Sequence, residues 1–205
     1  MTILAADSVS GFFQEVVEDA MKSRRVDTAD AVTTYLVGIL ADYAHPDRRA
    51  GETLARPLAF LLDEALNTPD PAERFDRLRA LGDGVLYSCG FFADHFEARG
   101  LDQRYLFGIG ACAYGTAGSM IRSAPDAAAA EGPPDRDLFG ELATKFDVFV
   151  DVLGDVADST IAMSAASSKG LLKVYERWLR TGSDRLAQAL STHGLVPTRG
   201  PKGLQ

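Results

Sequence analysis

The chain has 205 residues, of which 46% are hydrophobic and 24% are charged, a composition typical of one soluble globular domain. Its 29 acidic residues outnumber its 21 lysines and arginines, which gives a formal net charge of −8. Because nucleic acids and anionic membranes bind basic surfaces, this balance argues against either of them as the main partner.

The sequence also lacks the marks of a targeted or membrane-spanning chain. The opening residues, MTILAADSVSGFF, have neither the basic region nor the long apolar run of a secretory signal. No stretch approaches the roughly 18 uninterrupted apolar residues of a transmembrane helix. The two cysteines, Cys89 and Cys112, do not lie in a metal-binding spacing. We therefore expect a cytoplasmic protein without a membrane partner.

The first part of the chain predicts amphipathic helices separated by polar turns. Residues 1–9 are expected to form a loose lead-in, and Ser10 to cap the first helix. A second helix is expected to stop before Pro46, because proline cannot continue a helix. A short third helix is expected over residues 58–66, ended by the turn NTPD.

Two helices rich in small residues follow, GDGVLYSCGFFADHF and FGIGACAYGTAGSMI. Asp70 before Pro71 predicts the start of the first, since aspartate caps helices and proline is favoured at the first helical position. Gly100 is expected to separate the two. Each glycine inside a helix costs about 1 kcal/mol relative to alanine, so their number predicts a compensating close approach of backbones.

The run LGDGVLYSCGFF followed by ACAYGTAG resembles a group of uncharacterised bacterial helical proteins that carry a similar GD, aromatic, GFF and AYG pattern. The resemblance covers residues 30–120. It implies an all-helical domain, and it supplies no activity, ligand or catalytic residue for this chain.

The second part of the chain predicts a loop, two long helices and a tail. Residues 124–137 are expected to be a flexible loop, and residues 138–163 one long helix. The last long helix is expected to end at His193. Its apolar arc contains Leu171, Tyr175, Trp178, Leu179, Gly182, Leu186 and Leu190. Residues 196–205 are expected to be disordered.

No segment shows the period-2 alternation of a strand, so the predicted fold class is all-α. About seven helices joined mostly by short turns give a single-domain helical bundle over residues 10–195.

Two charged stripes are the most regular surface feature of the sequence. The acidic stripe lies on the helix predicted over 138–163 and consists of Asp147, Asp151, Asp155 and Asp158. The basic stripe lies on the last helix and consists of Lys169, Lys173, Arg177 and Arg180. Each stripe lies opposite the apolar residues of its own helix, so both are expected to point outward and not to meet. They are interpreted as solvated faces or as docking surfaces for a partner or a second copy.

The small-residue helices leave three interpretations open: tight packing within the monomer, a close helix interface in a homodimer, and a slot for a flat apolar ligand. The slot would be lined by Gly82, Cys89, Ala111, Gly115 and Gly118. A second side of the first helix mixes acids with aromatic rings and is expected to contact another helix or a protein partner. That side consists of Asp83, Tyr87, Phe91 and Asp94.

No catalytic or metal-binding constellation is recognisable. Of the three histidines, His45 and His193 are interpreted as helix-terminal residues, and His95 lacks a ligand partner at helical spacing. The two cysteines lie in apolar helices and are interpreted as inert core residues. We therefore expect no metal and no cofactor.

These observations favour a soluble, non-enzymatic helical protein that associates with a protein partner or forms a homodimer, in a regulatory or scaffold role. The alternative is a carrier or sensor that binds an apolar ligand or a flat cofactor between the small-residue helices.

Overall fold

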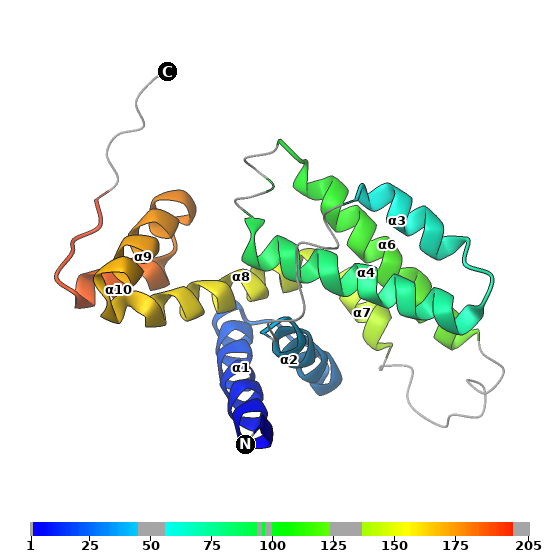
Figure 1. The fold of residues 1–205 in the computed structure, drawn as a ribbon, viewed down its shortest axis with the longest axis horizontal. Helices are drawn as coiled ribbons and strands as arrows, with labels where there is room; N and C mark the ends of the chain where they lie inside the picture. Colours follow the sequence, from blue (N-terminus) through cyan, green and yellow to red (C-terminus); the bar gives the residue numbers. More distant parts are fainter. Residues whose placement is uncertain (1, 45–55, 94–95, 97–99, 124–136, 199–205) are drawn as a thin grey trace. The chain divides into compact units, whose positions relative to one another are not determined.

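The computed structural model describes residues 2–44, 56–93, 96, 100–123 and 137–198 (Figure 1). These residues contain nine α-helices and no strand, which confirms the predicted all-α class with slightly more helices than expected. The helices are α1 (Thr2–Arg24), α2 (Asp30–Ala44), α3 (Leu58–Leu66), α4 (Pro71–Phe91), α6 (Gln103–Arg122), α7 (Leu138–Thr144), α8 (Phe146–Met163), α9 (Ser168–Thr181) and α10 (Asp184–Thr192).

The chain forms two compact units, an N-terminal unit of Met1–Leu153 and a C-terminal unit of Gly154–Gln205. The boundary between them falls inside α8, so the predicted domain of residues 10–195 extends over both units.

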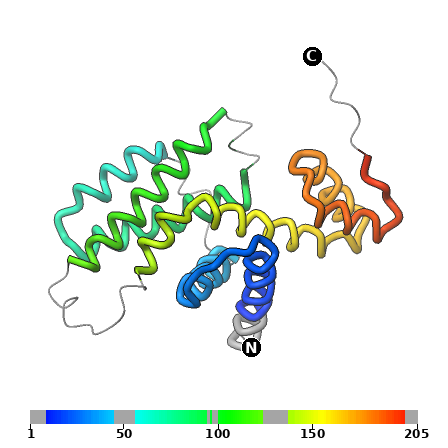
Figure 2. Tube along the Cα trace, turned by 180° about the vertical axis from the view of Figure 1, so that it is seen from behind, coloured from blue at the N-terminus to red at the C-terminus, as the bar shows by residue number. Residues whose placement is uncertain are grey.

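In the N-terminal unit, α1 packs beside α2, and α4 packs against α6, which also contacts α7 (Figures 1 and 2). The helices bury one face each, and their largest fully buried side chains include Tyr114, Phe149, Leu36, Leu40, Leu78 and Leu86. Burying a leucine or phenylalanine side chain contributes about 1.5–3 kcal/mol, so this apolar interior is the main stabilising feature of the unit.

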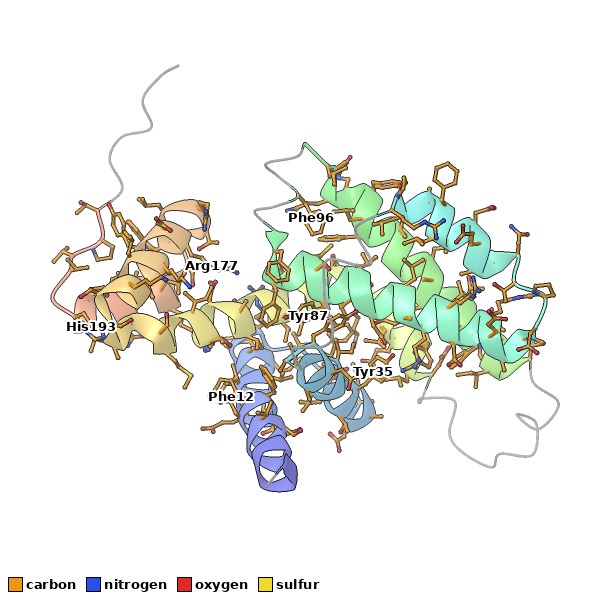
Figure 3. The ribbon with its side chains drawn as sticks, in the orientation of Figure 1. Phe12, Tyr35, Tyr87, Phe96, Arg177 and His193 are labelled. Atoms are coloured by element: carbon orange, nitrogen blue, oxygen red, sulfur yellow. The ribbon has the colours of Figure 1, made fainter. Side chains whose placement is uncertain are left out.

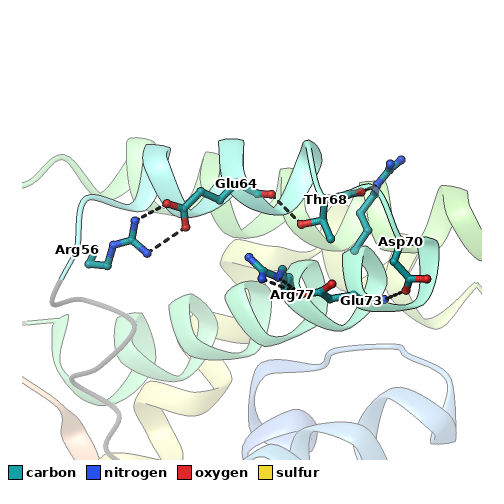
Figure 4. A network of polar contacts seen from close by, with 7 residues as sticks. Arg56, Glu64, Thr68, Asp70, Glu73 and Arg77 are labelled. Atoms are coloured by element: carbon teal, nitrogen blue, oxygen red, sulfur yellow. Dashed lines mark hydrogen bonds and ion pairs between the residues drawn. The ribbon is translucent and has the colours of Figure 1, made fainter.

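The turn between α3 and α4 shows how local chemistry starts a helix (Figure 4). The Asp70 carboxylate accepts a hydrogen bond from the Glu73 amide at 2.8 Å, and Pro71 occupies the first helical position, as predicted. The hydroxyl of Thr68 donates to the Glu64 carbonyl at 2.8 Å and closes the end of α3. These contacts satisfy backbone groups that the two helix ends would otherwise leave without partners.

The C-terminal unit has its own core, built around α9 and α10. The core residues are Ala165, Val174, Trp178, Leu186 and Leu190, with Ile161, Ala162, Leu171, Ala187 and Ala189 packed against them. A short 3-10 turn (Ser164–Ala166) precedes α9, and the side chain of Ser167 caps that helix by accepting from the Gly170 amide at 3.0 Å.

Three predicted helix boundaries are wrong. Helix α1 begins at Thr2 and not at Ser10, so the expected lead-in is helical. The helix predicted over 138–163 is interrupted at Lys145, whose φ of −107° and ψ of 27° are not helical. The last long helix is interrupted at Gly182, whose φ of +69° is left-handed and ends α9, because glycine adopts that conformation without a Cβ clash.

Other predictions concern segments outside the described residues. The helix stop at Pro46, nearly all of the loop over 124–137 and the end of the tail over 196–205 belong to this group, as do His45 and His95. The stop at His193 is confirmed, with Gly194 at a φ of +78° directly after it.

Candidate interaction surface

The glycine notches of α4 and α6 are filled by side chains of the same chain. A Cβ added at Gly82 would lie 2.6 Å from the Tyr114 ring, and one at Gly110 would collide with the Phe146 ring. A Cβ at Gly118 would lie 3.0 Å from an Asp137 oxygen. Gly82 and Gly110 therefore admit aromatic rings close to the helix backbone, whereas Gly90 shows the expected close approach of backbones, because a Cβ there would lie 3.3 Å from the Val150 carbonyl oxygen.

The three glycines among the residues predicted to line a ligand slot have different neighbours. Gly82 faces Tyr114, whereas a Cβ at Gly115 would lie 3.7 Å from the Ala143 Cβ on α7. Cys89 is buried, and its burial raises the pKa of the thiol to about 12, so the thiol stays protonated at neutral pH. Ala111 is half-buried. These contacts indicate packing within the chain.

The interpretation of both cysteines as core residues is wrong for Cys112, which is exposed. It lies one turn after Gly108, which is also exposed and has no neighbour where a Cβ would be. Helix α6 is packed against α4 and α7, and this side of α6 faces away from its buried residues. An apolar stretch of small residues does not by itself show which side of the helix is covered.

Asp83, predicted to meet a partner, is an internal hydrogen-bond acceptor. Its Oδ1 accepts from the Tyr35 hydroxyl at 2.7 Å and from the Tyr114 hydroxyl at 2.8 Å. Figure 3 labels Tyr35 on α2. The guanidinium of Arg79 lies 4.0 Å from Oδ2. Burial raises the pKa of Asp83, and the two hydroxyl donors and Arg79 oppose that rise. The pKa values of both tyrosines are also raised, mainly by burial. This cluster ties α2, α4 and α6 together.

The aromatic residues beside Asp83 form a stack between α2 and α4. The rings of Tyr43 and Tyr87 are parallel with centroids 4.3 Å apart, and Phe91 continues the stack at 4.7 Å from Tyr87. Tyr87 and Phe91 are half-buried, whereas Phe92 beside them is exposed. Asp94 lies outside the described residues. Of the two contacts expected for these rings, another helix or a protein partner, the structure shows the first, because Tyr87 stacks on Tyr43 of α2.

The acidic stripe does not form one continuous exposed face. Asp147 and Asp151 are exposed, and Asp151 pairs with Arg24 of α1 at 2.8 Å. Asp155 is half-buried and Asp158 is buried.

The prediction that the two charged stripes cannot meet is wrong, because Asp158 Oδ1 lies 2.5 Å from Nε of Arg177, and both side chains are only 8% exposed. Arg177 is labelled on α9 in Figure 3. The last turns of α8 bury a different side from its first turns, with Ile161 and Ala162 packed into the C-terminal core. Asp158 therefore lies on the buried side of these last turns, next to α9.

The least expected feature is an apolar stripe on the outside of α9. Leu172, Tyr175 and Leu179 are 56%, 38% and 45% exposed, and their spacing places them on one side of the helix. The opposite side buries Gly170, Val174, Arg177 and Trp178. The prediction that Tyr175 and Leu179 belong to the apolar arc is wrong with respect to burial, because both are exposed. The presence of Leu172, an apolar residue outside that arc, could have indicated this exposed apolar side from the sequence.

Basic residues flank this stripe. Lys169 and Lys173 are exposed and lie about a quarter to a third of a turn around the helix from it. Among the residues that the structure describes, the C-terminal unit contains five lysines and arginines and four aspartates and glutamates. The basic charge beside the stripe therefore comes from Lys169 and Lys173 themselves.

Two further features are absent from the described residues. No group of three or more histidine, cysteine, aspartate or glutamate side chains is arranged there to hold a metal ion. None of the helices described combines the length and the hydropathy that are needed to cross a bilayer. Comparison with known proteins finds no matching family, no matching curated protein and no matching solved structure.

Proposed function

We propose that this chain is a non-enzymatic protein that acts by binding another protein, and that the exposed face of α9 carries the contact. The observation that supports this is the stripe of Leu172, Tyr175 and Leu179, which is exposed although its members are large and apolar. A regulatory or scaffold role in the cytoplasm is consistent with such a surface and with two free cysteines.

The arrangement of the stripe distinguishes it from ordinary surface leucines. Single exposed apolar residues are common on soluble proteins and need no explanation. Here three such residues follow one another along two turns of one helix, with an aromatic ring in the middle. Protein interfaces are enriched in aromatic anchors surrounded by polar residues, and burying such anchors supplies most of the binding free energy.

A photo-crosslinking amino acid placed at position 172 or 179 tests this proposal in cells that make the protein. We expect both positions to give the same discrete crosslinked product, and a crosslinker at the exposed Gln188 of α10 to give none. With the label at 172, Leu179→Ser should strongly reduce the product, because it removes a neighbouring contact. Equal products from all three positions, or none from 172 and 179, would contradict the proposal.

A further inference from the structure

The residues that flank the α9 stripe identify the chemistry of its partner. We infer that α9 binds an acidic amphipathic helix, whose apolar side covers Leu172, Tyr175 and Leu179 and whose carboxylates meet Lys169 and Lys173. This inference rests on the proposed function and adds the class of partner to it.

The size of the stripe matches a helix. Its seven-residue span corresponds to about 10 Å along the axis of α9, or two helical turns. Amphipathic helices dock through apolar side chains spaced at three, four and seven residues, which cover a stripe of this length. The exposed ring of Tyr175 lies at the middle of the span and provides a central anchor.

The charges give the sign of the partner. Lys169 and Lys173 are exposed and follow one edge of the stripe. Complementary charge across an interface speeds encounter and excludes partners of the wrong sign. A helix with carboxylates beside its apolar side chains can cover the apolar stripe and pair with the two lysines.

Glu176 lies between the stripe and the lysines, so the carboxylates of the partner would meet Lys169 and Lys173 beyond it. A second copy of the chain fits the face less well. Two copies paired antiparallel through α9 would place Leu172 of one copy near Leu179 of the other, which is favourable. That same pairing would bring the two lysine-bearing edges together, which is unfavourable.

The inference can be tested with two stapled helical peptides that share the same leucine positions. One peptide carries glutamates beside the leucines, and the other carries lysines. Fluorescence anisotropy with the full chain should show at least tenfold tighter binding of the acidic peptide, and the difference should shrink as salt screens the charges. The double variant Lys169→Glu with Lys173→Glu should reverse the preference for the acidic peptide. The double variant Leu172→Ser with Leu179→Ser should weaken the binding of both peptides.

A charge reversal at the exposed Lys22 of α1 serves as the matched control and should leave the preference unchanged. Equal binding of the two peptides, or a preference that survives Lys169→Glu with Lys173→Glu, would overturn the inference. Crosslinks from positions 172 and 179 would still uphold the proposed function in that case, so the two failures are distinguishable.

Two further measurements distinguish the other occupants. If vesicles of phosphatidylcholine and phosphatidylserine in equal parts bind through Leu172 and Leu179 while neither peptide does, the face binds membranes and the inference is overturned. If sedimentation shows a dimer that Leu172→Ser with Leu179→Ser dissociates, the occupant is a second copy and the inference is likewise overturned. The account expects neither vesicle binding nor a dimer of this kind.

Discussion

Asp83 shows how one buried carboxylate organises its surroundings. Two tyrosine hydroxyls donate to the same oxygen, and the tyrosines come from different helices, so the carboxylate joins three segments that are distant in sequence. Hydrogen bonds to a charged acceptor are stronger than those between neutral groups, but burial of the charge opposes ionisation. The balance raises the pKa of Asp83.

The raised pKa predicts the sign of a pH effect on stability. The folded state holds the Asp83 proton more tightly than the unfolded state, where aspartate has a pKa of about 3.9. The stability contribution of Asp83 is therefore fully present below that value and is lost as the pH rises through the folded-state pKa. Asp83→Asn lacks this ionisation. Its free energy of unfolding should therefore increase relative to that of the wild type as the pH rises from about 4 to about 8.

Urea unfolding at the two pH values measures this gain. Asp76→Asn, at an exposed position of the same helix, is the control and should change little with pH relative to the wild type. A difference between Asp83→Asn and the wild type that stays constant with pH would show that the ionisation of Asp83 is not coupled to folding.

At the scale of an element, α6 contains two glycines with opposite roles. A Cβ at Gly110 would meet the Phe146 ring, whereas a Cβ at Gly108 would meet nothing within 4 Å. We expect Gly110→Ala to destabilise the protein by about 1–3 kcal/mol through overpacking. Gly108→Ala should stabilise it by up to about 1 kcal/mol, because alanine favours the helix and no clash occurs.

Thermal unfolding of the two alanine variants, made in the same helix two positions apart, gives a direct comparison. A gain in melting temperature for both variants would mean that Phe146 can move aside at little cost. A loss for both would mean that the surface around Gly108 is covered in solution.

The helix boundaries show what the sequence could and could not predict for single elements. Asp70 and Pro71 predict the start of α4 correctly, because capping is a local interaction. The break at Gly182 also had a local signal, a glycine followed by Ser183 and Asp184, which commonly begin a helix. The apolar arc that ran through Gly182 concealed this signal, since α9 and α10 bury residues in one core.

At the scale of the whole molecule, periodicity was enough to predict an all-α fold. The pairing of Asp158 with Arg177 was not predictable in this way, because it depends on how the hairpin of α8 and α9 turns its faces. The exposure of Leu172, Tyr175 and Leu179 was likewise hidden, since helical periodicity identifies apolar sides but not the number of neighbours available to cover them.

The lysines beside the α9 stripe give this exposed face its meaning. The net charge of −8 argues against nucleic acids and anionic membranes as the main partner, yet Lys169 and Lys173 place positive charge beside an apolar surface. We therefore expect this stripe to be open in the folded protein and available to a partner.

The most direct test compares the cost of a serine at Leu179 with that at Leu186, which is fully buried in the same unit. The full chain is unfolded in urea while Trp178, the single tryptophan, reports on the C-terminal core by fluorescence. The account predicts a loss of less than about 0.5 kcal/mol for Leu179→Ser and at least about 2 kcal/mol for Leu186→Ser. A loss for Leu179→Ser equal to that for Leu186→Ser would show that the stripe is covered within the folded chain and would contradict the account.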